Sequence, residues 1–129
     1  MAGGRILIVE DEGITALYIQ QRVQQFGYEP VGVVACGTDA IEHALTLHPD
    51  VILMDILLKG PMDGIQAAAA IRSQYPCPVI YLTAHADKPT IDRAKVTEPA
   101  GYVLKPVNEW ELHTAIETAL HRDSGVGPA

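Results

Sequence analysis

The amino-acid sequence predicts an α/β fold in which one parallel sheet lies between two layers of helices. Short apolar runs of four to six residues alternate with longer segments of helical periodicity, and this pairing occurs five times along the 129 residues. Such alternation is typical of repeated strand–helix units joined by right-handed crossovers. A chain of this length, with 48% hydrophobic and 19% charged residues, suits one compact domain.

The first unit begins with the apolar run Arg5-Ile-Leu-Ile-Val9, which predicts a strand. Apolar residues three and four positions apart then mark one face of a helix: Ala16, Ile19, Val23 and Phe26. Gly27 follows, where a left-handed residue often ends a helix. The second unit is predicted as a strand at 30–35, because proline is tolerated at a strand's first residue, followed by a helix at 38–47.

The third unit starts after Pro49, which disfavours helical geometry in the residue before it and so ends the preceding helix. A strand begins at Val51, and a loop at 56–63 contains Gly60 and Pro61. A helix at 64–74 completes this unit.

The last two units are a strand at 78–82 with a polar helix at 87–96, and a strand at 101–104 with a final helix. Apolar residues at helical spacing define that final helix: Leu112, Ala115, Ile116 and Ala119. We therefore predict a domain at 4–121 and a loose tail at 122–129, which contains glycine and proline.

Charge and composition exclude several classes of function. Nine Lys and Arg against sixteen Asp and Glu leave a net charge of −7, which disfavours direct binding of nucleic acid. No apolar stretch approaches the roughly 20 residues of a membrane span, and the N-terminus lacks a secretory signal pattern. We expect a cytoplasmic protein without membrane contact. Cys36 and Cys77, which have no metal-binding spacing, are expected to be buried free thiols.

Four of the predicted strands end on a residue that could take part in chemistry. Glu10 and Asp11 follow the first strand, Asp55 the third, Thr83 the fourth and Lys105 the fifth. Parallel strands gather their carboxyl ends at one edge, where α/β sheets place ligands. We therefore expect these groups to meet in one crevice suited to a divalent cation and a phosphoryl group.

The three acids have both a chemical and a structural interpretation. Mg²⁺ prefers oxygen ligands, so Glu10, Asp11 and Asp55 form a plausible incomplete coordination shell. Asp55 could attack phosphorus and form an aspartyl phosphate while the metal offsets charge repulsion. Alternatively, the acids at 10–12 could cap a helix, and Asp55 could form an Asx turn after its strand.

The remaining strand-end residues are also ambiguous one by one. Lys105 could reach across the crevice to Asp55 or its phosphoryl oxygens, or be a solvated lysine. Thr83 could donate its hydroxyl to a phosphoryl oxygen, although threonine is common at strand ends. Pro106 makes Lys105–Pro106 a candidate for a cis peptide bond. The four strand ends taken together are the evidence for phosphoryl chemistry.

Over residues 4–121 the chain resembles the receiver domain of two-component response regulators. Five pieces carry the resemblance, in the family's order and close to its spacing: Ile6-Leu-Ile-Val-Glu-Asp-Glu12, Asp50-Val-Ile-Leu-Met-Asp55, Met62-Asp-Gly-Ile65, Pro78-Val-Ile-Tyr-Leu-Thr-Ala84 and Gly101-Tyr-Val-Leu-Lys-Pro106. The resemblance implies a flavodoxin-like, CheY-like sheet of five strands in the order 2-1-3-4-5 with five helices.

The resemblance also implies a phosphorelay role. A sensor histidine kinase or phosphotransfer protein would donate a phosphoryl group to Asp55. Mg²⁺ would be held by Asp11, Asp55, the main-chain carbonyl of Leu57 and, through water, Glu10. Such a domain assists its own phosphorylation and dephosphorylation but is not a turnover enzyme.

The resemblance assigns the switch to Thr83 and Tyr102 as well. The output surface would be the helix at 87–96, the strand at 101–104 and the last helix, through which a homodimer could form; the downstream effector is unknown. The loop after Asp55 is one residue longer than in many receivers, and the apolar Leu57 indicates slow hydrolysis of the acyl phosphate.

Four other functions fit the sequence less well. A degenerate receiver would act as a docking module without phosphorylation, although Asp55, Thr83 and Lys105 are all intact. A phosphatase with an aspartyl nucleophile would usually have a second acid where this chain has Leu57. A histidine phosphotransfer role is disfavoured because no helical bundle is predicted around the histidines, and a P-loop enzyme is excluded because its glycine-rich motif is missing.

Overall fold

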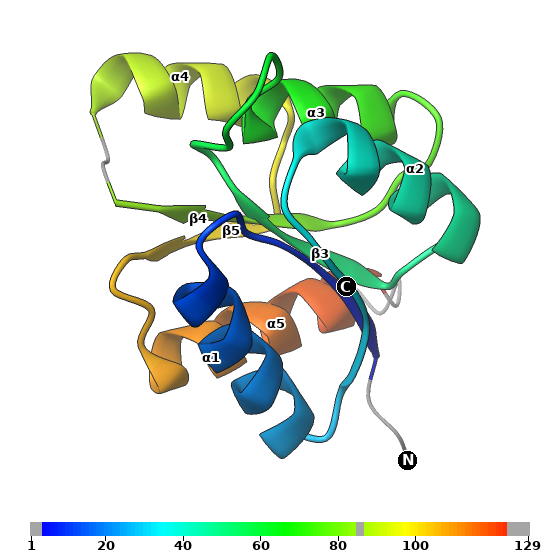
Figure 1. Cartoon of the computed structure of the whole chain (residues 1–129), viewed down its shortest axis with the longest axis vertical. Coiled ribbons are helices and arrows are strands. Elements are labelled where there is room, and N and C mark those ends of the chain that lie inside the picture. Colours follow the sequence, from blue (N-terminus) through cyan, green and yellow to red (C-terminus); the bar gives the residue numbers. More distant parts are fainter. Residues whose placement is uncertain (1–3, 85–86, 124–129) are drawn as a thin grey trace.

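A computed structural model of the chain describes residues 4–84 and 87–123, and Figure 1 shows its layers. The five strands are β1 (Arg5–Val9), β2 (Glu29–Val34), β3 (Val51–Asp55), β4 (Val79–Thr83) and β5 (Gly101–Leu104). The five helices are α1 (Gly13–Gln25), α2 (Gly37–Leu47), α3 (Gly64–Arg72), α4 (Lys88–Val96) and α5 (Glu109–Asp123). Strands and helices alternate, as the sequence predicts.

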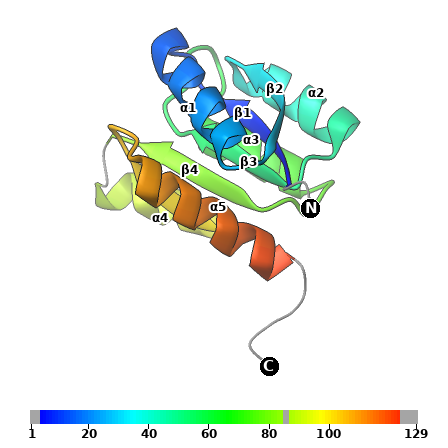
Figure 2. The ribbon, with the colours of Figure 1, turned by 90° about the horizontal axis from the view of Figure 1, so that it is seen from below.

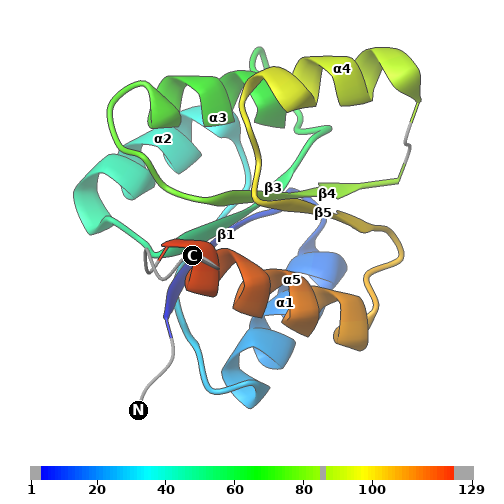
Figure 3. The same cartoon turned by 180° about the vertical axis from the view of Figure 1, so that it is seen from behind.

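All strands are parallel and lie in the order β2-β1-β3-β4-β5, which confirms the predicted doubly wound topology. Helices α2, α3 and α4 cover one face of the sheet (Figures 1 and 3). Helices α1 and α5 cover the other face, which Figure 2 shows from the front. Because every strand runs the same way, the carboxyl ends of all five strands lie at one edge of the sheet.

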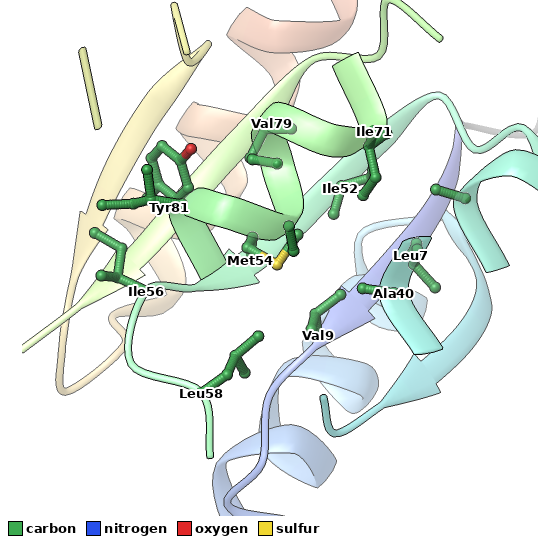
Figure 4. Packing of buried hydrophobic residues seen from close by; sticks show 14 of the residues in the cluster. Leu7, Val9, Ala40, Ile52, Met54, Ile56, Leu58, Ile71, Val79 and Tyr81 are labelled. Carbon is green, nitrogen blue, oxygen red and sulfur yellow. The ribbon is translucent and has the colours of Figure 1, made fainter. Parts of the chain in front are cut away.

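The core has one part on each face of the sheet, because successive residues of a strand point to opposite sides. Leu7 and Val9 pack under α2 and α3, while Ile6 and Ile8 pack against α1 and α5. Figure 4 shows the first of these clusters, in which Met54 lies on the same side as Val9. Burial on both faces explains why the central strands are continuous apolar runs rather than alternating ones.

Several boundaries differ from the predicted ones by one or two residues. Strand β2 begins at Glu29, before the proline, because Glu29 N–H donates to the carbonyl of Gly4 at 3.0 Å. The strand pairs with β1 through a register shift between Ile6 and Leu7. Helix α3 ends at Arg72 instead of 74, where Ser73 is its C-cap.

The last helix extends two residues past the predicted boundary between domain and tail. Helix α5 continues through Asp123, so residues 122 and 123 are helical. The helix residues 109–123 contain no glycine or proline. Positions 124–129 of the predicted tail lie outside the described residues. The predicted burial holds for Cys77, but Cys36, at the N-cap position of α2, is only half-buried.

An aspartate caps each of the helices α3 and α4. Asp63 forms a capping box with Gln66 at the start of α3, and Asp87 accepts a hydrogen bond from Thr90 N–H at the start of α4. No helix in the described part of the chain is long and apolar enough to cross a membrane.

Candidate functional site

Acidic side chains from two neighbouring strands meet at the carboxyl edge of the sheet. Glu10 and Asp11 directly follow β1, and Asp55 is the last residue of β3, which lies beside β1. One carboxylate oxygen from each of the three residues lies within 4.8 Å of the others. The acids line an open pocket of about 340 Å³, to which Lys59 and Lys105 also contribute. The predicted gathering of these acids is therefore present in the fold.

Lys105 lies between two of the acids. Its Nζ atom is 3.0 Å from Asp55 Oδ2 and 2.9 Å from Glu10 Oε1, although β4 separates β5 from β3. Burial acts to lower the pKa of Lys105, but the contacts with Glu10 and Asp55 together outweigh it and leave the pKa raised. Lys105 is thus a half-buried cation that pairs with two acids and partly neutralises the site, which argues against its interpretation as a solvated strand-end lysine.

Glu10 is the most perturbed acid of the site. Its side chain is wholly buried. Burial raises the pKa of Glu10 to about 7, the nearby Asp55 carboxylate adds to the increase, and the Lys105 ammonium opposes it. Glu10 Oε1 makes its ionic contact with Lys105 at 2.9 Å, yet no described residue forms a well-aligned hydrogen bond to it. A buried oxygen in this position suits a further cation or a proton.

A main-chain N–H group holds one oxygen of each acid. Glu12 N–H donates to Glu10 Oε2 at 3.1 Å, and Leu57 N–H donates to Asp55 Oδ1 at 3.2 Å. Lys59 N–H donates to Asp11 Oδ2 at 3.1 Å. The bond from Leu57 N–H closes an Asx turn, as the structural interpretation of Asp55 predicts. Asp55 also lies in the cluster of acids, as the chemical interpretation predicts.

Helix capping does not explain the acids at 10–12. The N-cap position of α1 is Glu12, and no side chain caps the helix there. Asp11 instead faces the pocket and accepts its hydrogen bond from Lys59, which is distant in sequence. Capping of α1 therefore does not explain the position of Asp11.

The remaining predicted residues lie at the same edge, except Tyr102, which lies within β5. Thr83, 3% exposed, ends β4, and its carbonyl accepts from Lys105 N–H at 2.8 Å. The peptide bond between Lys105 and Pro106 is cis. Tyr102 on β5 is 37% exposed, with its ring centroid 6.1 Å from that of Tyr81. The exposed Leu57 side chain lies at the pocket rim.

Two contributions to the site escape the pattern of strand ends. The Lys59 N–H group belongs to the main chain and has no signature in the residue type. Gly64 starts α3 directly against the carbonyl of Asp55: a Cβ atom built on it would lie 2.0 Å from that oxygen. The motif Met62-Asp-Gly-Ile65 marks this glycine, but only the packing of α3 on β3 explains it.

The donor set fits a small divalent cation. Mg²⁺ is usually bound by one or two carboxylates together with water and a phosphate oxygen. Glu10, Asp11 and Asp55 offer clustered oxygens, including the buried Glu10 Oε1 that lacks a hydrogen bond among the described residues. The arrangement can hold a cation beside the Asp55 carboxylate, which also contacts the Lys105 ammonium.

Comparisons with known proteins agree with this geometry. Residues 6–117 match the family model of the response regulator receiver domain. The chain is 35% identical over 118 residues to the transcriptional regulatory protein PdtaR of Mycobacterium tuberculosis, covering 92% of this chain and 57% of that protein. It therefore spans little more than half the length of this curated relative.

Solved structures show the same likeness. The signal receiver domain of a modulated diguanylate cyclase from Desulfovibrio desulfuricans is 37% identical, with a TM-score of 0.89 over 94% of this chain and 96% of that one. The N-terminal domain of a response regulator/sensory box/GGDEF protein from Carboxydothermus hydrogenoformans is 36% identical, with a TM-score of 0.86 over 94% and 97%. With a family model matching most of its length, the chain belongs to the response regulator receiver domains of two-component signalling systems.

Proposed function

We propose that this receiver domain accepts a phosphoryl group on Asp55, from the phosphohistidine of a sensor histidine kinase or phosphotransfer protein. The observation that carries the proposal is the position of Asp55, a buried carboxylate held by Lys105 and clustered with Glu10 and Asp11 at an open pocket. A buried carboxylate is costly unless ions or donors face it.

In this step an oxygen of Asp55 bonds to phosphorus while the P–N bond of the donor breaks and its electron pair returns to the imidazole. Bound Mg²⁺ would neutralise negative charge on the phosphoryl oxygens. Glu10, Asp11, Asp55 and the main-chain carbonyl of Leu57 are the proposed metal-binding groups. Lys105, already 3.0 Å from Asp55 Oδ2, would pair with a phosphoryl oxygen.

Thr83 and Tyr102 are the proposed switch. Thr83 ends β4, beside Asp55 at the end of β3, so its hydroxyl would donate to the phosphoryl group. Tyr102 pairs with Tyr81 on β4 and is partly exposed, and its ring would turn toward the sheet on phosphorylation. The change would alter a surface made by α4, β5 and α5.

That surface carries exposed apolar residues suited to a protein partner. Val96 at the end of α4 is 82% exposed, and Leu104 on β5 is also exposed. Large apolar side chains left in water favour burial against a partner protein. We propose that this surface contacts the downstream effector or a second copy of the chain.

A second apolar surface lies next to the phosphoacceptor pocket. Ile14 and Leu17 on α1 are exposed, and an open pocket of about 530 Å³ is lined by Ile14, Tyr18 and Val107. Because the phosphoryl donor must place its histidine over Asp55, we propose that the donor protein docks here.

A cytoplasmic location stays a prediction from the sequence.

The test is the intact mass after incubation with a small phosphodonor, with and without Mg²⁺. We expect a Mg²⁺-dependent gain of one phosphoryl group that Asp55→Asn abolishes. Asp39→Asn, which changes an exposed acid of α2, is the matched control and should be phosphorylated normally. No gain in the unchanged chain would leave the alternative, a docking module that works without phosphorylation.

A further inference from the structure

Lys59 has an unusual position in the loop between β3 and α3. Its side chain is exposed at the rim of the acidic pocket, but its main-chain N–H points inward and donates to Asp11 Oδ2 at 3.1 Å. The bond joins residues 48 positions apart, from the loop after β3 to the loop after β1. It is thus a tertiary contact and not a feature of either loop alone.

The neighbours of Lys59 keep the N–H in this position. Leu58, 8% exposed, packs with the cluster under α2 and α3, and Figure 4 shows it directed toward that core. Gly60 has a φ of 101°, a conformation that L-residues rarely adopt. Farther along, Gly64 N–H donates to the Ile56 carbonyl at 2.8 Å and closes the loop. Lys59 is therefore held between a buried anchor and a turn.

Asp11 is held differently from the other two acids. Glu10 and Asp55 are buried and each lies within 3.0 Å of Lys105, whereas Asp11 is only half-buried. Among the interactions of the described residues, the bond from Lys59 is the hydrogen bond that fixes the Asp11 carboxylate. With Oδ2 held by the loop, Oδ1 remains available to a cation.

We propose that the main-chain N–H of Lys59 is a positioning group that orients Asp11 for binding of a divalent cation. The inference rests on the proposed Mg²⁺ site and adds a group from the loop that is one residue longer than in many receivers. Groups that hydrogen-bond to metal-binding side chains orient them, and losing one typically weakens metal binding about 10- to 100-fold. The ammonium of Lys59 has no part in this role.

The experiment is a calorimetric titration with Mg²⁺ of the unphosphorylated chain and two variants at this position. Lys59→Pro removes the N–H and should weaken Mg²⁺ binding about tenfold. Lys59→Ala is the matched control, since it removes the same side chain but keeps the N–H. Its affinity should be unchanged or higher, because losing a positive charge at the rim cannot disfavour a cation.

Two further readouts separate the possible outcomes. Hydrogen exchange of the residue-59 amide should be slow in the unchanged chain and fast in Asp11→Ala if the bond exists. Should Lys59→Pro fail to fold, Gly60→Ala replaces it: nothing lies within 4 Å of the added Cβ atom, yet the φ of 101° strains the turn and should weaken Mg²⁺ binding. If Lys59→Ala binds Mg²⁺ with the same affinity as Lys59→Pro, or as Gly60→Ala where that variant is used, the role of the Lys59 N–H is refuted but the metal site is not. No Mg²⁺ binding by the unchanged chain would overturn the metal site as well.

Discussion

Gly64→Ala is expected to damage both stability and phosphorylation, because this glycine lies against the backbone of the phosphoacceptor strand. An added Cβ atom would lie 2.0 Å from the carbonyl oxygen of Asp55 and 3.0 Å from Ile56 Cα. Real Cβ contacts are essentially never shorter than 3.0 Å, so α3 and the end of β3 must separate by about 1 Å or more. Both neighbours are backbone atoms and cannot move aside as a flexible side chain would.

The magnitude follows from that displacement. Forcing extra volume into a packed site costs about 1–3 kcal/mol. The bond from Gly64 N–H to the Ile56 carbonyl, 2.8 Å long, would be weakened as well, at about 1 kcal/mol. We expect a loss of about 3 kcal/mol in the free energy of unfolding, measured with urea. A 1 Å displacement of Asp55 should slow phosphorylation by a small phosphodonor about 100-fold.

Gly13→Ala is the matched control, because Gly13 also begins a helix beside the site but has no atom within 4 Å of a built Cβ. It should be as stable as the unchanged chain or more stable by up to about 1 kcal/mol, since alanine is the better helix former. If Gly64→Ala unfolds at the same urea concentration as Gly13→Ala and is phosphorylated at the same rate, the steric reasoning is wrong.

Three further predictions concern buried polar groups. Because the pKa of Glu10 is raised from 4.5 to about 7 in the folded chain, the native state keeps a proton that the unfolded state releases between these values. Without metal, the free energy of unfolding should therefore fall by on the order of 3 kcal/mol from pH 4.5 to 7. In urea unfolding, Glu10→Gln should show a smaller decrease over this pH range. An equal decrease in both proteins would show that Glu10 is not its cause. Lys105→Met leaves the Glu10 and Asp55 carboxylates without their cation and should lower the free energy of unfolding by about 3–5 kcal/mol near pH 8. Added Mg²⁺ should recover part of this loss. The same recovery by Na⁺ at equal ionic strength would argue against a specific metal site. The Tyr81 hydroxyl lies 2.7 Å from Thr97 Oγ1, which itself donates to a main-chain carbonyl, so Tyr81 is the donor. Tyr81→Phe should cost about 1 kcal/mol, whereas Thr97→Val leaves a buried hydroxyl unpaired and should cost about 1–3 kcal/mol, both measured by urea unfolding; the reverse order would contradict the assigned donor.

Much of the candidate site could be predicted from residue order alone. Glu10, Asp55 and Lys105 each follow an apolar run, and parallel strands bring their carboxyl ends to one edge whatever the details of packing. For this reason the three residues lie together even though 45 residues separate Glu10 from Asp55 and 50 separate Asp55 from Lys105. The same rule cannot say which neighbours a strand-end side chain will contact.

Whereas the order of strands within the sheet followed from the family resemblance, the hydrophobic pattern by itself determined the α/β class, the number of strands and helices and their alternation along the chain, and the edge at which the charged groups gather. These follow from local periodicity and from the requirement that strands buried on both faces be apolar throughout. Only the tertiary structure decided that Lys105 contacts both acids, that Glu10 is wholly buried with a pKa of about 7, and that Lys59 N–H holds Asp11. Hydrogen bonds and desolvation depend on distances of a few tenths of an ångström between segments far apart in the chain, which no spacing along the sequence encodes.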